Sequence, residues 1–216
     1  MKTRDRIIHA ALALFNEHGE RPITTNHIAA HIEISPGNLY YHFRNKQEIV
    51  REIFAWYSAE LIERFSPWQG QYESLTLLKH YLDSIFNLMW KYRFFYANLP
   101  EILQRDPELH QSYIQVQDKL QVNLINIMQV FIDMQLLVID EQEMKKLVTT
   151  LHLIASSWLA YQSAMSANAS ITERVIHQGM LQIISVMKPN ATPQGLEQLQ
   201  LLEEGVRAMH ASTING

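Results

Sequence analysis

Two short helical segments lie near the amino terminus with only three residues between them. In the first, Ile28 and Ile32 share one face of a helix that starts near Thr24. In the second, Leu39 and Phe43 are four residues apart and share one face in the same way. Neither segment is long enough to be stable alone, so both must pack against other helices. The arrangement predicts a helix-turn-helix, whose second helix can enter the major groove of DNA.

The remaining sequence also has the pattern of helices, and it contains neither the alternation of a strand nor a repeat. The helix ends coincide with residues that cap or interrupt helices, among them Gly19, Asp106-Pro107 and Asp140. The expected helices outside the helix-turn-helix cover residues 3–18, 46–65, 72–93, 94–104, 107–135, 141–167, 172–187 and 192–210. We therefore expect an all-α protein, in which a three-helix helix-turn-helix domain precedes a larger helical bundle.

The helix expected at residues 46–65 is placed to connect these two parts. It opens with Asn45-Lys46-Gln47-Glu48, which resembles a capping box with Asn in the Ser/Thr position. Its apolar residues cover more than one face, as in a helix that is packed on two sides. Residues 66–70, Ser-Pro-Trp-Gln-Gly, then interrupt the pattern. We expect a DNA-binding domain at residues 1–48, this connecting helix, and a second domain at residues 49–216.

Charge is unevenly distributed between the two expected domains. Residues 1–51 carry seven Lys or Arg and five acidic residues, whereas the rest of the chain carries eleven and seventeen. The first segment also holds five of the ten histidines. A mildly basic segment on an acidic body suits a module that binds phosphate groups.

Several residue types and motifs that other protein classes need are absent. The sequence has no cysteine, so it has no disulfide, thiolate metal site or cysteine nucleophile. His27 and His31 are spaced as a metal-binding pair would be on a helix. However, Ile28 stands where a zinc protease needs glutamate, and no third ligand is nearby. With neither a nucleophile elbow nor a phosphate loop, the sequence predicts no enzyme activity and no metal or other cofactor.

Features that direct a protein to membranes are also missing. The first residues carry Asp5, His9 and Asn16 among spaced apolar positions, unlike a signal peptide. No run reaches the roughly 18 uninterrupted apolar residues of a membrane span. We expect a cytoplasmic protein with no membrane partner.

The second short helix supplies most of the candidate DNA contacts. Ser35 is expected to cap it, and Pro36 fits its first position, where the missing N–H costs nothing. Leu39 and Phe43 point inward, so the helix start and the other positions are available to DNA. The candidates are Ser35, Pro36, Gly37, Asn38, Tyr40, Tyr41 and His42.

The candidate residues have distinct chemical roles. Gly37 lets the backbone approach phosphate closely at a helix start that presents unpaired N–H groups. Asn38 can pair with adenine or bind phosphate, and it can equally be a solvated polar residue. Tyr40 and Tyr41 offer hydroxyls and flat rings, or they pack the helix against its neighbours. Lys46 can hold a phosphate or be an ordinary surface lysine.

These residues resemble the DNA-binding signature of the TetR family. The resemblance rests on ALALFNEHG, Ile28-Ala29, Ser35-x-Gly37-x-Leu39-Tyr40-x-x-Phe43 and Lys46, within a match over about residues 3–65. It implies a homodimer that binds double-stranded DNA at a palindromic operator, usually as a repressor, and is released by a ligand. By position, it implies DNA contacts at Thr25, Gly37, Asn38, Tyr40, Tyr41 and Lys46. One position departs from the family pattern, because the turn has Glu33 where glycine is usual. If Glu33 must adopt a left-handed conformation, this costs about 1 kcal/mol relative to glycine.

The domain at residues 49–216 is expected to bind the effector and to dimerise. Its many large side chains form either ordinary core or the lining of a pocket for a small, mostly apolar molecule. Candidate lining residues are Tyr81, Trp90, Tyr113, Trp158 and Tyr161. His110 and His152 are candidates for a polar anchor.

Dimerisation is expected because two recognition helices must lie about 34 Å apart to read successive major grooves. The resemblance places the interface on the helices at residues 141–167 and 172–187, and the helix at 46–65 would transmit ligand binding to the DNA-binding domain. Two alternatives remain: a DNA-binding regulator without a small ligand, acting as an activator or under a partner's control, and a helical enzyme.

Overall fold

The computed structural model describes residues 1–68, 70, 73–165 and 171–212, and this part of the chain is helical almost throughout. Its only pairing of β type is an isolated bridge between Leu137 and Ala191. The helices are α1 (Thr3–His18), α2 (Thr25–His31), α3 (Pro36–His42), α4 (Lys46–Arg64), α5 (Ser74–Lys91), α6 (Arg93–Arg105), α7 (Pro107–Asp133), α8 (Glu141–Met165), α9 (Glu173–Met187) and α10 (Pro193–Ser212), with a 3-10 turn at Lys188–Asn190. The all-α prediction is confirmed.

The predicted capping residues begin the helices of the structure. The Thr24 side chain accepts a hydrogen bond from the His27 N–H at 3.3 Å, and Ser35 accepts one from the Asn38 N–H at 3.2 Å. Asn45 caps α4 in the same way, through the Glu48 N–H at 2.9 Å. The predicted capping box is not reciprocal, however, because the Glu48 carboxylate accepts from the N–H of Arg44 instead.

Several helix ends differ from the predicted ones. The helix predicted to reach Gln135 ends at Asp133, because Gln135 itself adopts a positive φ of 58°. The helix predicted from Tyr72 begins at Ser74, and Tyr72 lies outside the described residues. Ala167, the predicted end of another helix, lies outside them as well.

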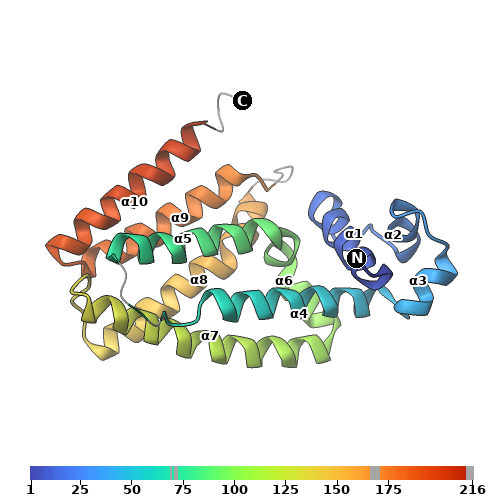
Figure 1. Ribbon diagram of the computed structural model, residues 1–216, viewed down its shortest axis with the longest axis horizontal. Coiled ribbons are helices and arrows are strands. Elements are labelled where there is room, and N and C mark those ends of the chain that lie inside the picture. The colour runs from blue at the N-terminus through green and yellow to red at the C-terminus, as the bar shows by residue number, and fades with distance from the viewer. Residues whose placement is uncertain (69, 71–72, 166–170, 213–216) are drawn as a thin grey trace.

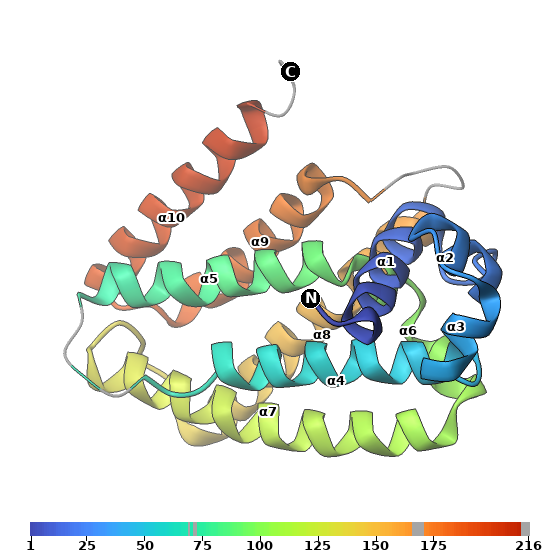
Figure 2. The ribbon, with the colours of Figure 1, turned by 45° about the vertical axis from the view of Figure 1, so that its right-hand side comes forward.

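The helices form a small head and a larger body that α4 connects (Figure 1). Helices α1, α2 and α3 form the head, and α5 to α10 form the body. Helix α4 packs against α1 at one end and against α5 and α7 along the rest of its length, as the turned view also shows (Figure 2). This confirms the prediction of a helix buried on two sides. Within the described ranges, no helix is both long enough and apolar enough to cross a membrane.

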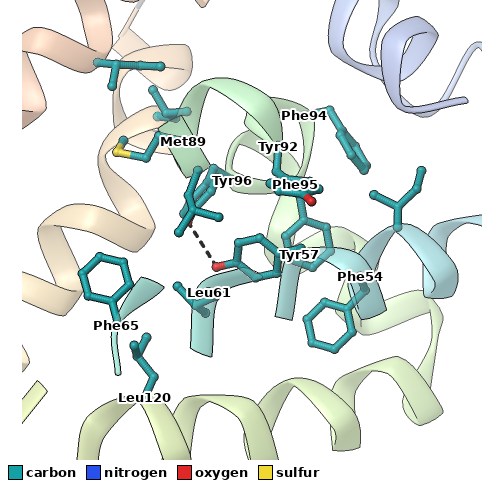
Figure 3. Packing of buried hydrophobic residues seen from close by; sticks show 14 of the residues in the cluster. Phe54, Tyr57, Leu61, Phe65, Met89, Tyr92, Phe94, Phe95, Tyr96 and Leu120 are labelled. Atoms are coloured by element: carbon teal, nitrogen blue, oxygen red, sulfur yellow. Dashed lines mark hydrogen bonds between the residues drawn. The ribbon is translucent and has the colours of Figure 1, made fainter. Parts of the chain in front are cut away.

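Aromatic rings from α4 and α6 fill the centre of the body (Figure 3). The ring of Tyr57 lies 5.3 Å from Tyr92, 5.5 Å from Phe95 and 5.7 Å from Tyr96, measured between centroids. Aromatic pairs at these distances contribute beyond the burial of their area. Helix α4 is thereby held to α6 as well as to α7.

Helix α6 is bent near its middle. Asn98 leaves the helical conformation, with φ −127° and ψ 15°, and Pro100 follows two residues later. Proline has no N–H, so one hydrogen bond of the helix is missing at this point. The Asn98 side chain donates to the Phe94 carbonyl at 2.9 Å and restores a hydrogen bond at the bend.

The head is joined to the end of α5 and to α6 by hydrogen bonds and an ionic cluster. The Asn16 side chain of α1 donates to the Lys91 carbonyl at 2.8 Å and accepts from the Phe94 N–H at 3.1 Å. Glu20, which is only 6 % exposed, follows α1 and binds both Lys46 at 2.9 Å and Arg105 at 2.6 Å. A single buried carboxylate therefore holds together the end of α1, the start of α4 and the end of α6.

Acid should weaken this junction. Burial raises the pKa of Glu20, but hydrogen bonds from Lys46 and Arg105 outweigh that effect and leave the pKa below its ordinary value. A carboxyl with a lowered folded pKa stabilises the protein above its unfolded pKa, about 4, and this contribution is lost as pH falls through the folded value. Urea unfolding between pH 6 and 3 should therefore show a steeper loss for the wild type than for Glu20→Gln. The matched control is Glu204→Gln, at an exposed position on α10, which should behave like the wild type. Equal slopes for the wild type and Glu20→Gln would contradict this prediction.

Candidate nucleic-acid interface and internal cavity

The turn between α2 and α3 is closed by a residue in the left-handed conformation. Glu33 has a φ of 58°, and it is followed by a hydrogen bond from the Ile34 N–H to the Ala29 carbonyl at 3.0 Å. The conformational cost of about 1 kcal/mol expected for a residue other than glycine therefore applies here. The Glu33 side chain is exposed, so its charge lies on the surface beside α3.

Helix α3 is anchored on its inner face and open on its outer face. Leu39 and Phe43 are buried, as predicted, and the Arg4 guanidinium lies over the Phe43 ring at 4.8 Å. On the outer face, Tyr41 is 85 % exposed and contacts the ring of His42 edge-on at 5.1 Å. An aromatic side chain this exposed contributes little to the fold and is free to contact another molecule.

The start of α3 is also open. Ser35, Pro36, Gly37 and Asn38 are all exposed. A Cβ added at Gly37 would meet only the Ser35 hydroxyl, at 4.0 Å, so the packing of the protein does not require a glycine there. Its small size leaves the backbone accessible from outside.

Tyr40 and Thr25 bring α2 and α3 together at the surface. Their hydroxyl oxygens are 3.1 Å apart, within hydrogen-bonding distance, and Tyr40 is 49 % exposed. Tyr40 is therefore a partly packed residue that still presents its hydroxyl region at the surface. The position of Tyr40 is compatible with packing against α2 and also with a contact to DNA.

The Lys46 ammonium is engaged within the protein. Besides the ion pair with Glu20, it donates to the Glu20 carbonyl at 2.8 Å, and its side chain is 19 % exposed. A phosphate contact by Lys46 stays a prediction, and it would require phosphate to compete with these oxygens.

Arg44 is a cation at the same surface that the sequence did not single out. It lies two residues after the end of α3, its side chain is exposed, and no hydrogen bond or ion pair of its guanidinium occurs within the described part of the chain. The signal available in the sequence was its position between the inward-facing Phe43 and the cap Asn45.

One histidine of the α2 pair, His27, has a structural role. Nδ1 of His27 accepts the Thr24 N–H at 3.3 Å, so this ring helps to cap the helix. Among the residues described, no group of three His, Asp or Glu side chains is arranged to hold a metal ion.

A cavity of about 120 Å³ lies inside the body, between side chains from α4 to α10. Most of its lining is apolar. This volume is similar to the cavities of roughly 150 Å³ that hold a benzene ring. It is smaller than a drug-sized pocket, so a larger ligand would require the helices to move apart.

Two of the five residues predicted to line a pocket do so, Tyr81 and Tyr113. The other three lie elsewhere. Trp158 donates to the Val175 carbonyl at 2.6 Å, Trp90 packs on the Arg93 guanidinium at 4.2 Å, and Tyr161 is exposed.

Of the two histidine candidates for a polar anchor, His152 lines the cavity, whereas His110 is exposed. Burial lowers the pKa of His152, which favours its neutral form.

The buried tyrosines of the cavity are uncharged. The hydroxyls of Tyr57 and Tyr96 lie 3.1 Å apart, and burial raises the pKa of both. Burial also raises the pKa of Tyr113. These phenols are therefore protonated at neutral pH and available as hydrogen-bond donors.

Comparison with protein families covers most of the chain. Residues 7–53 match the family model described as bacterial regulatory proteins, tetR family. Residues 56–199 match the model described as bacterial transcriptional repressor, also of TetR type.

Curated relatives match over part of the chain. The transcriptional regulator QacR of Staphylococcus aureus is 38 % identical over 73 residues, which are 34 % of this chain and 35 % of the relative. UidR of Escherichia coli is 30 % identical over 86 residues, 40 % of this chain and 42 % of the relative. The matched segments thus span well under half the length of these two proteins.

Solved structures match over nearly the whole chain. A TetR-family transcriptional regulator from Marinobacter aquaeolei VT8 is 35 % identical, with a TM-score of 0.85, over 95 % of this chain and 99 % of that one. GusR of Salmonella enterica, at 17 % identity and a TM-score of 0.58, covers 86 % of this chain and 95 % of its own and shares the fold.

Proposed function

The chain belongs to the TetR family of bacterial transcriptional regulators, and from this premise we propose that it is a ligand-responsive repressor. It binds a palindromic DNA operator as a homodimer in the cytoplasm, and a small, mostly apolar effector releases it. The observation that carries the proposal is an exposed recognition surface on α3 combined with an apolar cavity in the body of the same chain. The family consists of regulators and not of enzymes.

The outer face of α3 supports the DNA contacts. Tyr41 is exposed, His42 is partly exposed, and the open start of the helix at Gly37 and Asn38 can approach the DNA backbone. Thr25 and Tyr40 present paired hydroxyls beside it. We add Arg44 to the predicted contacts, because an exposed guanidinium next to α3 suits a phosphate.

The outward face of α8 supports the homodimer. Leu153, Ser157 and Tyr161 follow each other at intervals of four residues and are exposed, and Met165 extends this stripe. A helix face with exposed Leu, Tyr and Met side chains is suited to an interface with a second copy. Ala155 and Ser156 of the same helix line the cavity, so the dimer proposal rests on this stripe.

The cavity favours a ligand-responsive regulator over a regulator that binds no small ligand. It is bounded by Tyr57 of α4 and by Phe95 and Tyr96 of α6, and these two helices also contact the head. A ligand that fits only one arrangement of these helices would weaken DNA binding, and DNA would weaken ligand binding by the same factor.

The test of DNA binding is a gel shift with the full chain and DNA from upstream of its own gene, or DNA selected from a random pool, at fixed salt. Tyr41→Ala is expected to weaken specific binding about five- to 150-fold, because a base contact contributes roughly 1–3 kcal/mol. Its stability should stay within about 0.5 kcal/mol of the wild type, since the side chain is exposed.

The matched control for this test is Val122→Ala, which truncates an exposed apolar side chain on α7 of the body. It should leave the shift unchanged. Undiminished operator binding by Tyr41→Ala would rule out α3 as the recognition helix in the arrangement proposed here.

A further inference from the structure

One side chain of the cavity has a buried hydrogen-bond acceptor without a partner. Oε1 of Gln117, on α7, is buried and has no hydrogen-bond partner among the residues that the structure describes. Gln117 lines the cavity and lies one helical turn after Tyr113, which lines it too. A buried carbonyl without a donor costs free energy that a partner would recover. In this arrangement of side chains no described residue donates to this oxygen, so a donor that enters the cavity can bind it.

Several tyrosine hydroxyls that line the cavity already take part in hydrogen bonds within the protein. Tyr81 donates to the Ser66 carbonyl at 3.1 Å. Tyr57 and Tyr96 share one hydrogen bond but carry two hydroxyl protons, so this pair keeps one proton that can be donated. Among the described lining residues, Gln117 thus offers a free acceptor, and the tyrosine pair and the Tyr113 hydroxyl offer protons that can be donated.

Formal charge is missing from the lining. Of the described residues around the cavity, none is Asp, Glu, Lys or Arg, and the one titratable base, His152, is favoured in its neutral form. Burying a charged group there would leave the charge without a counter-ion, which is strongly unfavourable. The volume of about 120 Å³ further limits a ligand that fits without rearrangement to roughly one ring.

We propose that Gln117 is the specificity-determining residue of this cavity and that it selects an uncharged, ring-sized apolar molecule carrying an O–H or N–H donor. The donor binds Oε1 of Gln117, and a hydroxyl ligand can in addition accept the spare proton of the Tyr57–Tyr96 pair. This inference rests on the proposed function, because it assumes that the cavity is the effector site.

Phenol and toluene provide a matched pair of probes, since they differ by a hydroxyl in place of a methyl group of similar size. In a purely apolar cavity, toluene binds more tightly, because the phenol hydroxyl loses its hydrogen bonds to water. We expect isothermal titration calorimetry on the full chain to show phenol binding at least as tightly as toluene. In Gln117→Met, which keeps the length of the side chain but removes the acceptor, the ratio should shift about ten-fold in favour of toluene.

The matched control variant is Gln121→Met, at an exposed position on the same helix, which should keep the wild-type ratio. Benzylamine and benzoate test the charge requirement at pH 7.5, where one is a cation and the other an anion. Both should bind more weakly than phenol. Thermal unfolding of each variant without probe checks that it is folded, and toluene binding by Gln117→Met checks that its cavity is intact.

The outcomes separate this inference from the function on which it rests. If toluene binds the wild type much more tightly than phenol, and Gln117→Met does not change the ratio, the cavity is a binding site but Gln117 does not select the ligand. Tighter binding of benzylamine or benzoate than of phenol overturns the requirement for an uncharged molecule. If no probe binds, both the proposed role of Gln117 and the proposed effector site are wrong.

Discussion

Asp106→Ala is expected to lower the free energy of unfolding by about 2–3 kcal/mol. Asp106 is 5 % exposed and caps α7 through the Leu109 N–H at 3.1 Å, and loss of such a cap costs about 1 kcal/mol. Its carboxylate also binds the Arg51 guanidinium of α4 with two hydrogen bonds, at 2.7 and 2.8 Å. Removing one partner of a buried ion pair costs about 3–5 kcal/mol. The cost is smaller here because Arg51 is partly exposed and also contacts Glu108.

The control for Asp106 is Asp140→Ala. Asp140 caps α8 through the Glu143 N–H at 2.9 Å and is exposed, so its replacement removes a cap without removing a buried ion pair. We expect a loss of about 1 kcal/mol for this variant. Both are measured by urea unfolding at one protein concentration, since dimerisation would make stability depend on concentration. Equal losses would show that the pair between α4 and α7 contributes nothing beyond the cap.

Gly195→Ala is expected to destabilise the protein by about 3 kcal/mol through a steric clash. A Cβ at Gly195 would lie 2.0 Å from the carbonyl oxygen of Leu136 and 2.8 Å from its carbonyl carbon. These are backbone atoms, and the Thr192 N–H binds the same carbonyl oxygen at 3.0 Å, so they cannot move aside freely. Helix α10 would have to shift away from the loop between α7 and α8. Because Leu199 and Leu202 of α10 line the cavity, probe binding should weaken as well.

Gly205→Ala is the control, because it makes the same substitution on the same helix. A Cβ at Gly205 would meet no atom within 4 Å, and the position is exposed. Alanine favours a helix over glycine, so this variant should be more stable by about 0.5–1 kcal/mol. Thermal and urea unfolding should therefore show opposite signs for the two variants. A small or stabilising effect of Gly195→Ala would mean that α10 is not packed closely on the Leu136 loop.

Local rules predicted the head of this protein well. The starts of α2 and α3 follow from Thr24, Ser35 and Pro36, because the preference of these residues for helix starts depends only on neighbouring backbone atoms. The inward direction of Leu39 and Phe43 follows from helical spacing. These features need no knowledge of distant parts of the chain, and so the sequence alone is sufficient for them.

Long-range contacts explain what the sequence did not predict. Lys46 looked like a free cation because its partner, Glu20, is 26 positions away, and only the folded chain brings the two together. The predicted pocket lining depends on residue type, and type does not say which face of a helix packs inward. Trp158 therefore packs on α9 at Gly179, outside the cavity. Gln117 drew no attention for a related reason, since glutamine in a helix is usually a solvated residue.

The bend in α6 limits how the two ends of this helix can move. The bend lies between the two halves, at Asn98 and Pro100, and the Asn98 side chain bonds back to the first half. The first half carries Phe95 and Tyr96 into the cavity wall, and the last residue of the helix, Arg105, is bound to Glu20 of the head. One continuous helix therefore forms part of the cavity wall and an ionic contact with the head, so a displacement of α6 would alter both places.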